Sequence, residues 1–300
     1  MPRIIEGADS ACCELAECVA ALGETGFEPE DEASLAHAAS WLRRLGNNRT
    51  FLGDIMLKRL AERHREDPEQ SAYGPQVIML SRPSGDFFLR ANIWPSQDEH
   101  MFRASGGGTF VYGVPHDHNF DFLTVGYFGP GYWSDYYEFD YERLHGWTGE
   151  RAELRFVERS RLEPGKLMHY RAHRDVHSQL PPDALSVSLN IMHMRPSQAW
   201  FDQYRFDTEK DEVSAILNHG ASEIFLRIAV ALGGEEALDL AERFGGHHPS
   251  DRMRLVAWDA QAAALCDPAA RDALWRRAEA SGNRMVAMEA RARRAALQTA

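Results

Sequence analysis

The chain has 300 residues, and its 45 acidic against 33 basic residues give a formal net charge of −12. A surface of this sign repels phosphate backbones and anionic lipids, so we expect neither nucleic acid nor a membrane as a partner. The apolar runs fall short of the roughly 20 residues that span a bilayer, and no secretory leader is recognisable. The 4 cysteines form no disulfide pattern. Together these features predict a cytoplasmic protein.

The first part of the sequence, residues 1–72, has the pattern of helices. It is rich in Ala, Leu and Glu, and apolar residues such as Leu35, Ala38 and Leu42 recur at helical spacing. Turn-forming segments interrupt this pattern twice, and Asn48 or Thr50 is the candidate cap for the helix that follows the second of them. The sequence therefore predicts an N-terminal segment of two or three helices.

The middle part, residues 73–207, has the pattern of strands. Short runs of aromatic and β-branched residues alternate with Gly- and Pro-containing turn signals. The clearest of these runs cover residues 76–80, 87–94, 109–112 and 186–191. Short strands at such spacing predict an all-β sandwich or barrel in this part of the chain.

The last part, residues 208–300, is again helical in pattern. The stretch Asp251–Ala257 is echoed by Asn283–Ala287 at the spacing of a helical pair, and this weak repeat resembles short HEAT repeats. A plain helical appendage is the alternative interpretation. With the helices before and after the strands, the sequence predicts an α+β protein.

One motif in the strand-rich part suggests a metal site. In the stretch 114–119, His116 and His118 are separated by one residue. On a strand, residues two apart project to the same face, so both imidazoles would converge inside the barrel. Imidazole is a good ligand for borderline divalent metals, but a His-x-His pair alone is weak support for a metal site.

A second motif supplies the third ligand. Pro164 and Gly165 read as a turn into a hairpin, His177 follows, and an alternating strand comes after it. A His-x-His strand followed by a Pro-Gly turn and a third histidine is the layout of a cupin, a small β-barrel with a metal inside. Other histidines compete for the third position, and turn or surface roles are the alternative for each: His169, His173 and His193.

The fourth ligand of many cupins, a glutamate four or five positions after the second histidine, is replaced here by Phe122 and Leu123. Asp121 is nearby but has the opposite strand parity to His118, so it would reach the metal only through a bulge. We therefore expect a three-histidine site. Three neutral ligands leave the full charge on the metal, and this charge favours binding of anionic substrate atoms. The open coordination positions of the metal suit a bidentate substrate together with dioxygen.

The sequence resembles the cysteine dioxygenase branch of the cupins, the thiol dioxygenases. That family has an arginine on an early strand, a His-Asp-His motif, and a glycine turn leading to the third histidine. The resemblance covers about residues 87 to 195, and the flanking helices lie outside it. The segments that carry it are 89–94, 112–118 and 165–177.

The resemblance implies ferrous iron held by the three histidines, and a salt bridge between Arg90 and a substrate carboxylate. The guanidinium fork suits that role, and a surface arginine paired with an acid is the alternative. The cysteine that follows the His-x-His motif in the family is Leu123 here. The position of the family's catalytic tyrosine falls near His193, a candidate proton donor, and Tyr112 is a further catalytic candidate.

These features predict a mononuclear non-haem Fe(II) oxygenase, dioxygenase-like, that acts on a small carboxylate-bearing or amino-acid-like molecule with dioxygen. Two alternatives stay open. The site could hold Zn, Mn or Ni in a non-oxidative isomerase or hydrolase, or the barrel could sense a ligand while the C-terminal helices dock a partner. A homodimer is among the arrangements that the flanking helices allow.

Overall fold

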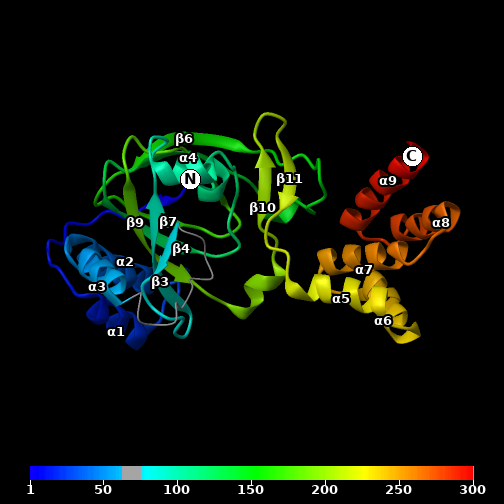
Figure 1. Ribbon diagram of the computed structural model, residues 1–300, viewed down its shortest axis with the longest axis horizontal. Helices are drawn as coiled ribbons and strands as arrows, with labels where there is room; N and C mark the ends of the chain where they lie inside the picture. The colour runs from blue at the N-terminus through cyan, green and yellow to red at the C-terminus, as the bar shows by residue number, and fades with distance from the viewer. Residues whose placement is uncertain (63–75, 300) are drawn as a thin grey trace. The chain divides into compact units, whose positions relative to one another are not determined.

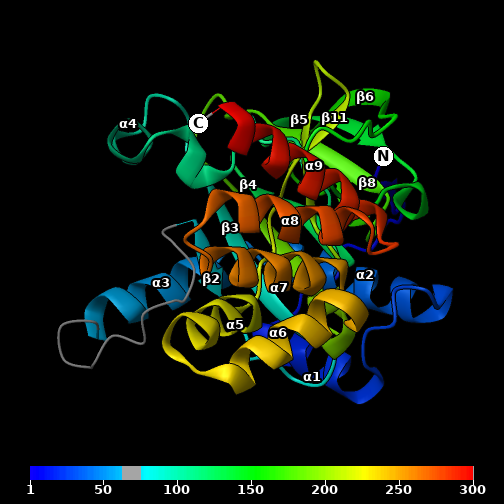
Figure 2. The ribbon, with the colours of Figure 1, turned by 90° about the vertical axis from the view of Figure 1, so that its right-hand side faces the viewer.

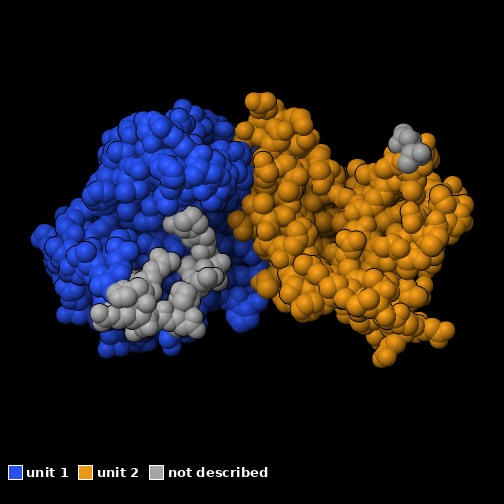
Figure 3. All heavy atoms as spheres, in the orientation of Figure 1, with its two compact units in different colours: residues 1–140, 154–198 blue, residues 141–153, 199–300 orange. Residues whose placement is uncertain are grey.

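The computed structural model of the chain describes residues 1–62 and 76–299. They form two compact units (Figure 3): residues 1–140 with 154–198, and residues 141–153 with 199–300. The predicted boundary between residues 72 and 73 lies outside the described residues. The fold is mixed α+β, with antiparallel sheets and with helices before and after the strands (Figure 1).

The first unit contains the N-terminal helices and most of the strands. Its helices are α1 (Leu15–Thr25), α2 (Glu32–Asn47), α3 (Phe51–Glu62), α4 (His100–Ser105) and the 3₁₀ helix η1 (Gly107–Phe110). Its strands are β1 (Arg3–Ile4), β2 (Val77–Met79), β3 (Phe87–Trp94), β4 (Phe122–Phe128), β5 (Tyr132–Glu138), β6 (Arg155–Leu162), β7 (Leu167–Tyr170), β8 (Asp175–Gln179) and β9 (Ser186–His193).

Among the described residues of this unit, the strands form a six-stranded sheet in the order β1-β7-β4-β9-β3-β2 and a three-stranded sheet in the order β6-β5-β8. Every ladder between these strands is antiparallel. The strands at the centre of the larger sheet are buried on both faces, which is why their sequences show little polar alternation.

The two faces of the six-stranded sheet belong to two different cores. On β3, Phe87, Leu89 and Ala91 pack with residues of α1, α2 and α3, and we call this the outer face. Phe88 and Trp94 point the other way and pack with aromatic residues of both sheets, and we call this the inner face. Since side chains alternate along a strand, the residues of β3 and β9, and those of β4 before the register shift that follows Gly126, can be assigned to one face.

The N-terminal helices begin where their caps predict. Asp31 Oδ1 accepts a hydrogen bond from Ala33 N at 2.9 Å and caps α2. Asn48 Oδ1 accepts from the backbone nitrogens of Thr50 and Phe51, both at 3.2 Å, so Asn48 is the one of the two candidates that caps α3. The helices cover the outer face of the sheet (Figure 1).

One predicted strand is wrong. Residues 109–112 follow helix α4 and form η1 and a turn instead. Val111 adopts a left-handed φ of 60°, which is unusual for a β-branched residue. The turn buries Phe110 completely and places its ring 6.2 Å from that of Phe102. Tertiary burial of the aromatic rings therefore outweighs the strand propensity of this run.

The second unit consists of a hairpin and five helices, counted over the described residues. Its elements are the 3₁₀ helix η2 (Tyr141–Arg143), β10 (Tyr204–Asp207), β11 (Glu212–Ile216), α5 (Ala221–Leu232), α6 (Glu235–His247), α7 (Asp251–Ala263), α8 (Pro268–Glu279) and α9 (Arg284–Thr299), and η3 (Pro196–Trp200) leads into it. Figure 2 shows α7 and α8 lying side by side.

The weak repeat marks two corresponding helix starts in this unit. Asn283, just before α9, donates its amide Nδ2 to Asp251 Oδ1 at 2.7 Å, and Asp251 begins α7. Ser250 caps α7 by accepting from Met253 N. In the described part of the chain, every helix is too short or too polar to span a bilayer.

Two glycines make the sheet register testable. A Cβ on Gly126 in β4 would lie 2.2 Å from the carbonyl oxygen of Glu163, whereas one on Gly53 in α3 would meet nothing within 4 Å. We expect Gly126→Ala to lower the free energy of unfolding by about 3 kcal/mol through overpacking. Gly53→Ala should raise it by about 0.5–1 kcal/mol. Urea denaturation measures both, and equal effects would contradict the close approach at Gly126.

Candidate metal centre

The structure brings His116, His118 and His177 together between the two sheets. His177 lies on β8, and His116 forms an antiparallel bridge with it, in which each backbone nitrogen donates to the other's carbonyl oxygen at 3.0 Å. His118 follows two residues later in an extended segment. All three side chains are buried, with 2 to 8% of their surface exposed. A three-histidine site is therefore present, formed by one segment before β4 and one strand of the smaller sheet.

The ring nitrogens of these histidines have the spacing of metal ligands. His177 Nε2 lies 3.1 Å from His118 Nε2 and 3.2 Å from His116 Nε2. Two nitrogens bound at about 2.1 Å to one metal are about 3.0 Å apart at a right angle and about 3.4 Å apart at the tetrahedral angle. These two separations fall between these values, and one ligand atom from each of the three side chains lies within 4.8 Å of the other two, so the three histidines are close enough to share one small divalent cation.

Hydrogen bonding and burial prepare the imidazoles to act as ligands. His116 Nδ1 lies 2.7 Å from the carbonyl oxygen of Val114, and because it must donate there, the lone pair is on Nε2, which faces the other rings. Burial lowers the pKa of His116 and holds the pKa of His118 and His177 well below the ordinary value, with the neighbouring imidazoles adding to the effect. Neutral imidazoles are the form that binds a metal.

Aromatic side chains enclose the histidines. The ring of His118 lies 5.0 Å from that of Phe122, and the ring of His177 lies 4.9 Å from that of Tyr170. The hydroxyls of Tyr170 and Tyr136 are 2.9 Å apart, and burial raises the pKa of Tyr136 to about 12. The phenol of Tyr136 is therefore neutral at physiological pH, and the surroundings of the histidines are largely aromatic.

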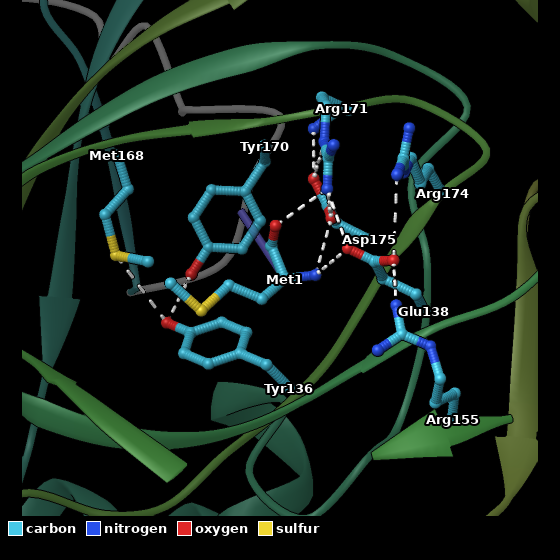
Figure 4. Close-up of polar contacts among 9 residues, drawn as sticks. All are labelled: Met1, Tyr136, Glu138, Arg155, Met168, Tyr170, Arg171, Arg174 and Asp175. Atoms are coloured by element: carbon cyan, nitrogen blue, oxygen red, sulfur yellow. Dashed lines mark hydrogen bonds and ion pairs between the residues drawn. The ribbon is translucent and has the colours of Figure 1, made fainter. Parts of the chain in front are cut away.

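An ion-pair network fixes the strand that carries His177 (Figure 4). Asp175, two residues earlier on β8, is fully buried on its side chain and accepts from Arg171 Nη2 at 2.6 Å and Nε at 3.0 Å. Arg171 also lies 3.1 Å from Glu138 on β5, and the amino group of Met1 lies 2.6 Å from the same carboxylate. Buried pairs of this kind hold their backbone in one geometry, which orients His177.

The neighbouring histidines of the sequence do not join the group. Asp121 Oδ1 lies 3.0 Å from His169 Nε2, so this carboxylate is paired away from the three histidines. His169 has the parity of Leu167, which packs on the outer face. His173 has a left-handed φ of 58°, in a turn where its backbone nitrogen donates to His118 O at 2.8 Å.

The three predicted catalytic residues lie in different places. Arg90 has the parity of Phe88 and Trp94, so it is on the inner face. Its positive charge is one of the smaller causes, after burial and the two imidazoles, of the lowered pKa of His118. Tyr112 is also in the inner core, where its hydroxyl donates to Pro95 O at 3.0 Å.

His193, the predicted proton donor, is on the other side of the sheet. It shares the parity of Ile191 on β9, and its ring packs edge-on against Phe27 at 5.8 Å. The six-stranded sheet separates this ring from the three histidines, so the structure does not bring His193 to the site.

Sequence reasoning missed buried polar side chains on β8 of the smaller sheet and on the inner face of the larger one. Gln179 places its Nε2 3.2 Å from His177 Nε2, and its Oε1 has no hydrogen-bond partner among the described residues. Thr124 on β4 and Asn190 on β9 are 1% and 3% exposed. The alternation of Ser188 and Asn190 with apolar residues was the available signal, but it equally fits a strand with one face in solvent.

The sequence matches no protein-family model and no curated protein with which it was compared. Among solved structures it is similar to the DMSP lyase DddQ from Ruegeria pomeroyi, at 11% identity and a TM-score of 0.25 over 64% of this chain and 78% of that chain. It is also similar to a structure of the DMSP lyases RdDddP and RnDddQII, at 14% identity and a TM-score of 0.24, again over 64% of this chain and 78% of that chain. A structure of prolyl 4-hydroxylases from Phytophthora capsici has 11% identity and a TM-score of 0.23, over 95% of this chain and 84% of that chain. Likenesses this slight carry no argument about function.

Proposed function

We propose that this protein is a mononuclear non-haem iron(II) oxygenase of the cupin type, acting with dioxygen on a small carboxylate-bearing or amino-acid-like substrate. The observation that supports it best is the position of His177 Nε2, 3.1 Å from His118 Nε2 and 3.2 Å from His116 Nε2, in a buried and neutral histidine set. Three protein ligands leave positions open for substrate and dioxygen, and iron with such open positions is typical of oxygenases.

The proposal includes the finer assignments made from the sequence. The two sheets of the first unit would be the walls of a cupin-type barrel, and the thiol dioxygenases would be its nearest functional type. The helical segments 1–72 and 208–300 would flank this barrel, the second of them with a HEAT-like arrangement. A cytoplasmic location and a homodimer stay predictions.

The residues around the candidate site have the following parts in this proposal. His116, His118 and His177 would hold the metal, which supplies, when bound, the electrons that activate dioxygen. Arg90 would bind the substrate carboxylate through its guanidinium fork, because it is the cation on the inner face of β3 and its field reaches His118. The aromatic rings of Phe122 and Tyr170 keep water from the reacting groups. His193 has no role here because of its position on the outer face.

Oxygen uptake by the metal-loaded protein tests the proposal. The purified chain is freed of metal, loaded separately with Fe(II) and Zn(II) under anaerobic conditions, and then mixed with dioxygen and a panel of amino acids and thiols. Iron-dependent uptake that starts only when a substrate is added supports the oxygenase. Turnover of a substrate by the zinc form without uptake would indicate the non-oxidative alternative.

The binding-module alternative has one supporting observation. Helix α5 exposes large apolar side chains on one side, with Phe225 65% and Leu232 84% exposed. Exposed apolar surface of this kind is typical of interaction sites. A protein that takes up no metal and consumes no oxygen, but retains a partner through α5, would support this alternative over the oxygenase.

A further inference from the structure

A row of polar side chains crosses the inner face of the six-stranded sheet. Arg90 on β3 is the register partner of Asn190 on β9, and Asn190 is the register partner of Thr124 on β4. Neighbouring strands lie about 4.8 Å apart, so the three side chains stand next to one another. Asn92 follows Arg90 on the same face of β3. The row thus begins at the residue proposed to bind a carboxylate and continues with neutral residues.

The neutral members of the row have polar atoms without partners. Thr124 Oγ1, Asn190 Nδ2 and Asn92 Oδ1 are buried and make no hydrogen bond to any described residue, and their side chains are at most 9% exposed. Buried polar groups in proteins are nearly always paired, so a cluster of unpaired ones at a candidate site points to a missing ligand. Because these residues are at most 9% exposed, contact with bulk solvent cannot explain the polar row.

The chemistry of these atoms restricts the ligand group. Asn190 Nδ2 is a donor, Asn92 Oδ1 is an acceptor, and the Thr124 hydroxyl can do either. A group that matches all of them must both accept and donate while carrying no charge. A hydroxyl and a primary amide have this property, whereas a second carboxylate would leave Asn92 Oδ1 facing a negative charge and a methyl group would leave every atom unpaired.

We propose that Thr124, Asn190 and Asn92 form a subsite for a neutral hydroxyl or amide group of the substrate, next to the carboxylate position at Arg90. This inference rests on the proposed function in that the substrate occupies the same inner face. It narrows the substrate class to carboxylates, including amino acids, whose side chain ends in a hydroxyl or an amide. A site built to pair such a group also rejects the apolar analogue, because its own buried atoms would then stay unpaired.

The test compares pairs of amino acids that differ in one hydroxyl. Isothermal titration of the full chain loaded with Fe(II), without oxygen, measures the affinities of L-serine against L-alanine and of L-homoserine against L-2-aminobutyrate. We expect the hydroxylated member of at least one pair to bind about tenfold or more tightly. Thr124→Val, which keeps the shape and removes the hydroxyl, should reduce this preference by about fivefold or more while leaving the affinity for the apolar member unchanged.

Two further readouts make the outcome decisive. Since the Thr124 hydroxyl has no hydrogen-bond partner among the described residues, Thr124→Val should not lower the melting temperature of the ligand-free protein, and the exposed Thr148→Val serves as the matched control. Equal affinity within both pairs, no binding of either pair, or a loss of several degrees in Thr124→Val would overturn the inference. Binding is measured without turnover, so the two proposals can fail separately. A preference for the hydroxylated amino acid without oxygen uptake would reject only the oxygenase proposal. Oxygen uptake without this preference would reject only the subsite.

Discussion

Replacing His118 with alanine is expected to remove most of the bound metal from the protein. His118 Nε2 lies 3.1 Å from His177 Nε2, and the remaining pair of histidines would leave a two-coordinate site. Loss of an outer hydrogen-bond partner of a ligand already weakens metal binding by about 10–100-fold, so loss of a ligand should weaken it by more than about 100-fold. Metal analysis after gel filtration and competition with a chelator measure this effect, and His116→Ala and His177→Ala should behave alike.

Two other histidines supply matched controls for this experiment. His169 and His193 are both 4% exposed, so their replacement removes a buried imidazole as well. They lie on the outer face with Asp121 and Phe27, and we expect His169→Ala and His193→Ala to keep the metal. His173→Ala should keep it too. If the His193 variant lost metal as fully as the His118 variant, the loss would reflect general unfolding, and the assigned ligand set would be wrong.

The metal-free protein is expected to lose stability steeply as the pH falls below about 6.5, the ordinary pKa of histidine. Burial lowers the pKa of His116, His118 and His177 in the folded state. Below pH 6.5 the unfolded chain therefore binds protons that the folded chain does not, and the free energy of unfolding decreases as the pH decreases. Below pH 6.5, three such groups change the free energy of unfolding by up to about 4 kcal/mol per pH unit. Above pH 7.5 they add nothing to its pH dependence.

Urea denaturation of the metal-free protein between pH 5 and pH 8 measures this dependence. His118→Ala should reduce the slope of the unfolding free energy against pH, below pH 6.5, by the contribution of about one bound proton. Replacement of the exposed His100 with alanine should leave this slope unchanged. Bound metal should oppose protonation and move the acid transition to lower pH. Stability that rose on acidification from pH 7 to pH 5 would contradict the burial of neutral imidazoles.

The sequence predicted the three-histidine group because its signals are local. Strand parity places His116 and His118 on one side even though the strand proper begins only at Phe122. Gly165, with a φ of 84°, forms the predicted turn, and β7 and β8 then carry the chain back to His177. Extended backbone and tight turns depend on neighbouring residues, so a single sequence is sufficient to find them.

The faces of the central sheet could not be predicted in the same way. Every residue of β9 is buried, because helices α1, α2 and α3 cover one face and the smaller sheet covers the other. Hydrophobic alternation therefore does not tell which face holds the site. The resemblance suggests His193 as a proton donor from its position in the sequence alone, and the same lack of alternation hides the inner-face position of Thr124 and Asn190. The arrangement depends on packing between segments more than 60 residues apart along the chain.

The central claim is that His116, His118 and His177 hold one metal ion, and X-ray absorption spectroscopy of the iron(II)-loaded protein tests it most directly. The predicted spectrum shows imidazole scattering from three nitrogen ligands at about 2.1 Å, and two in whatever iron the His177→Ala variant retains. A first shell of oxygen ligands alone, with no imidazole scattering, would contradict the claim.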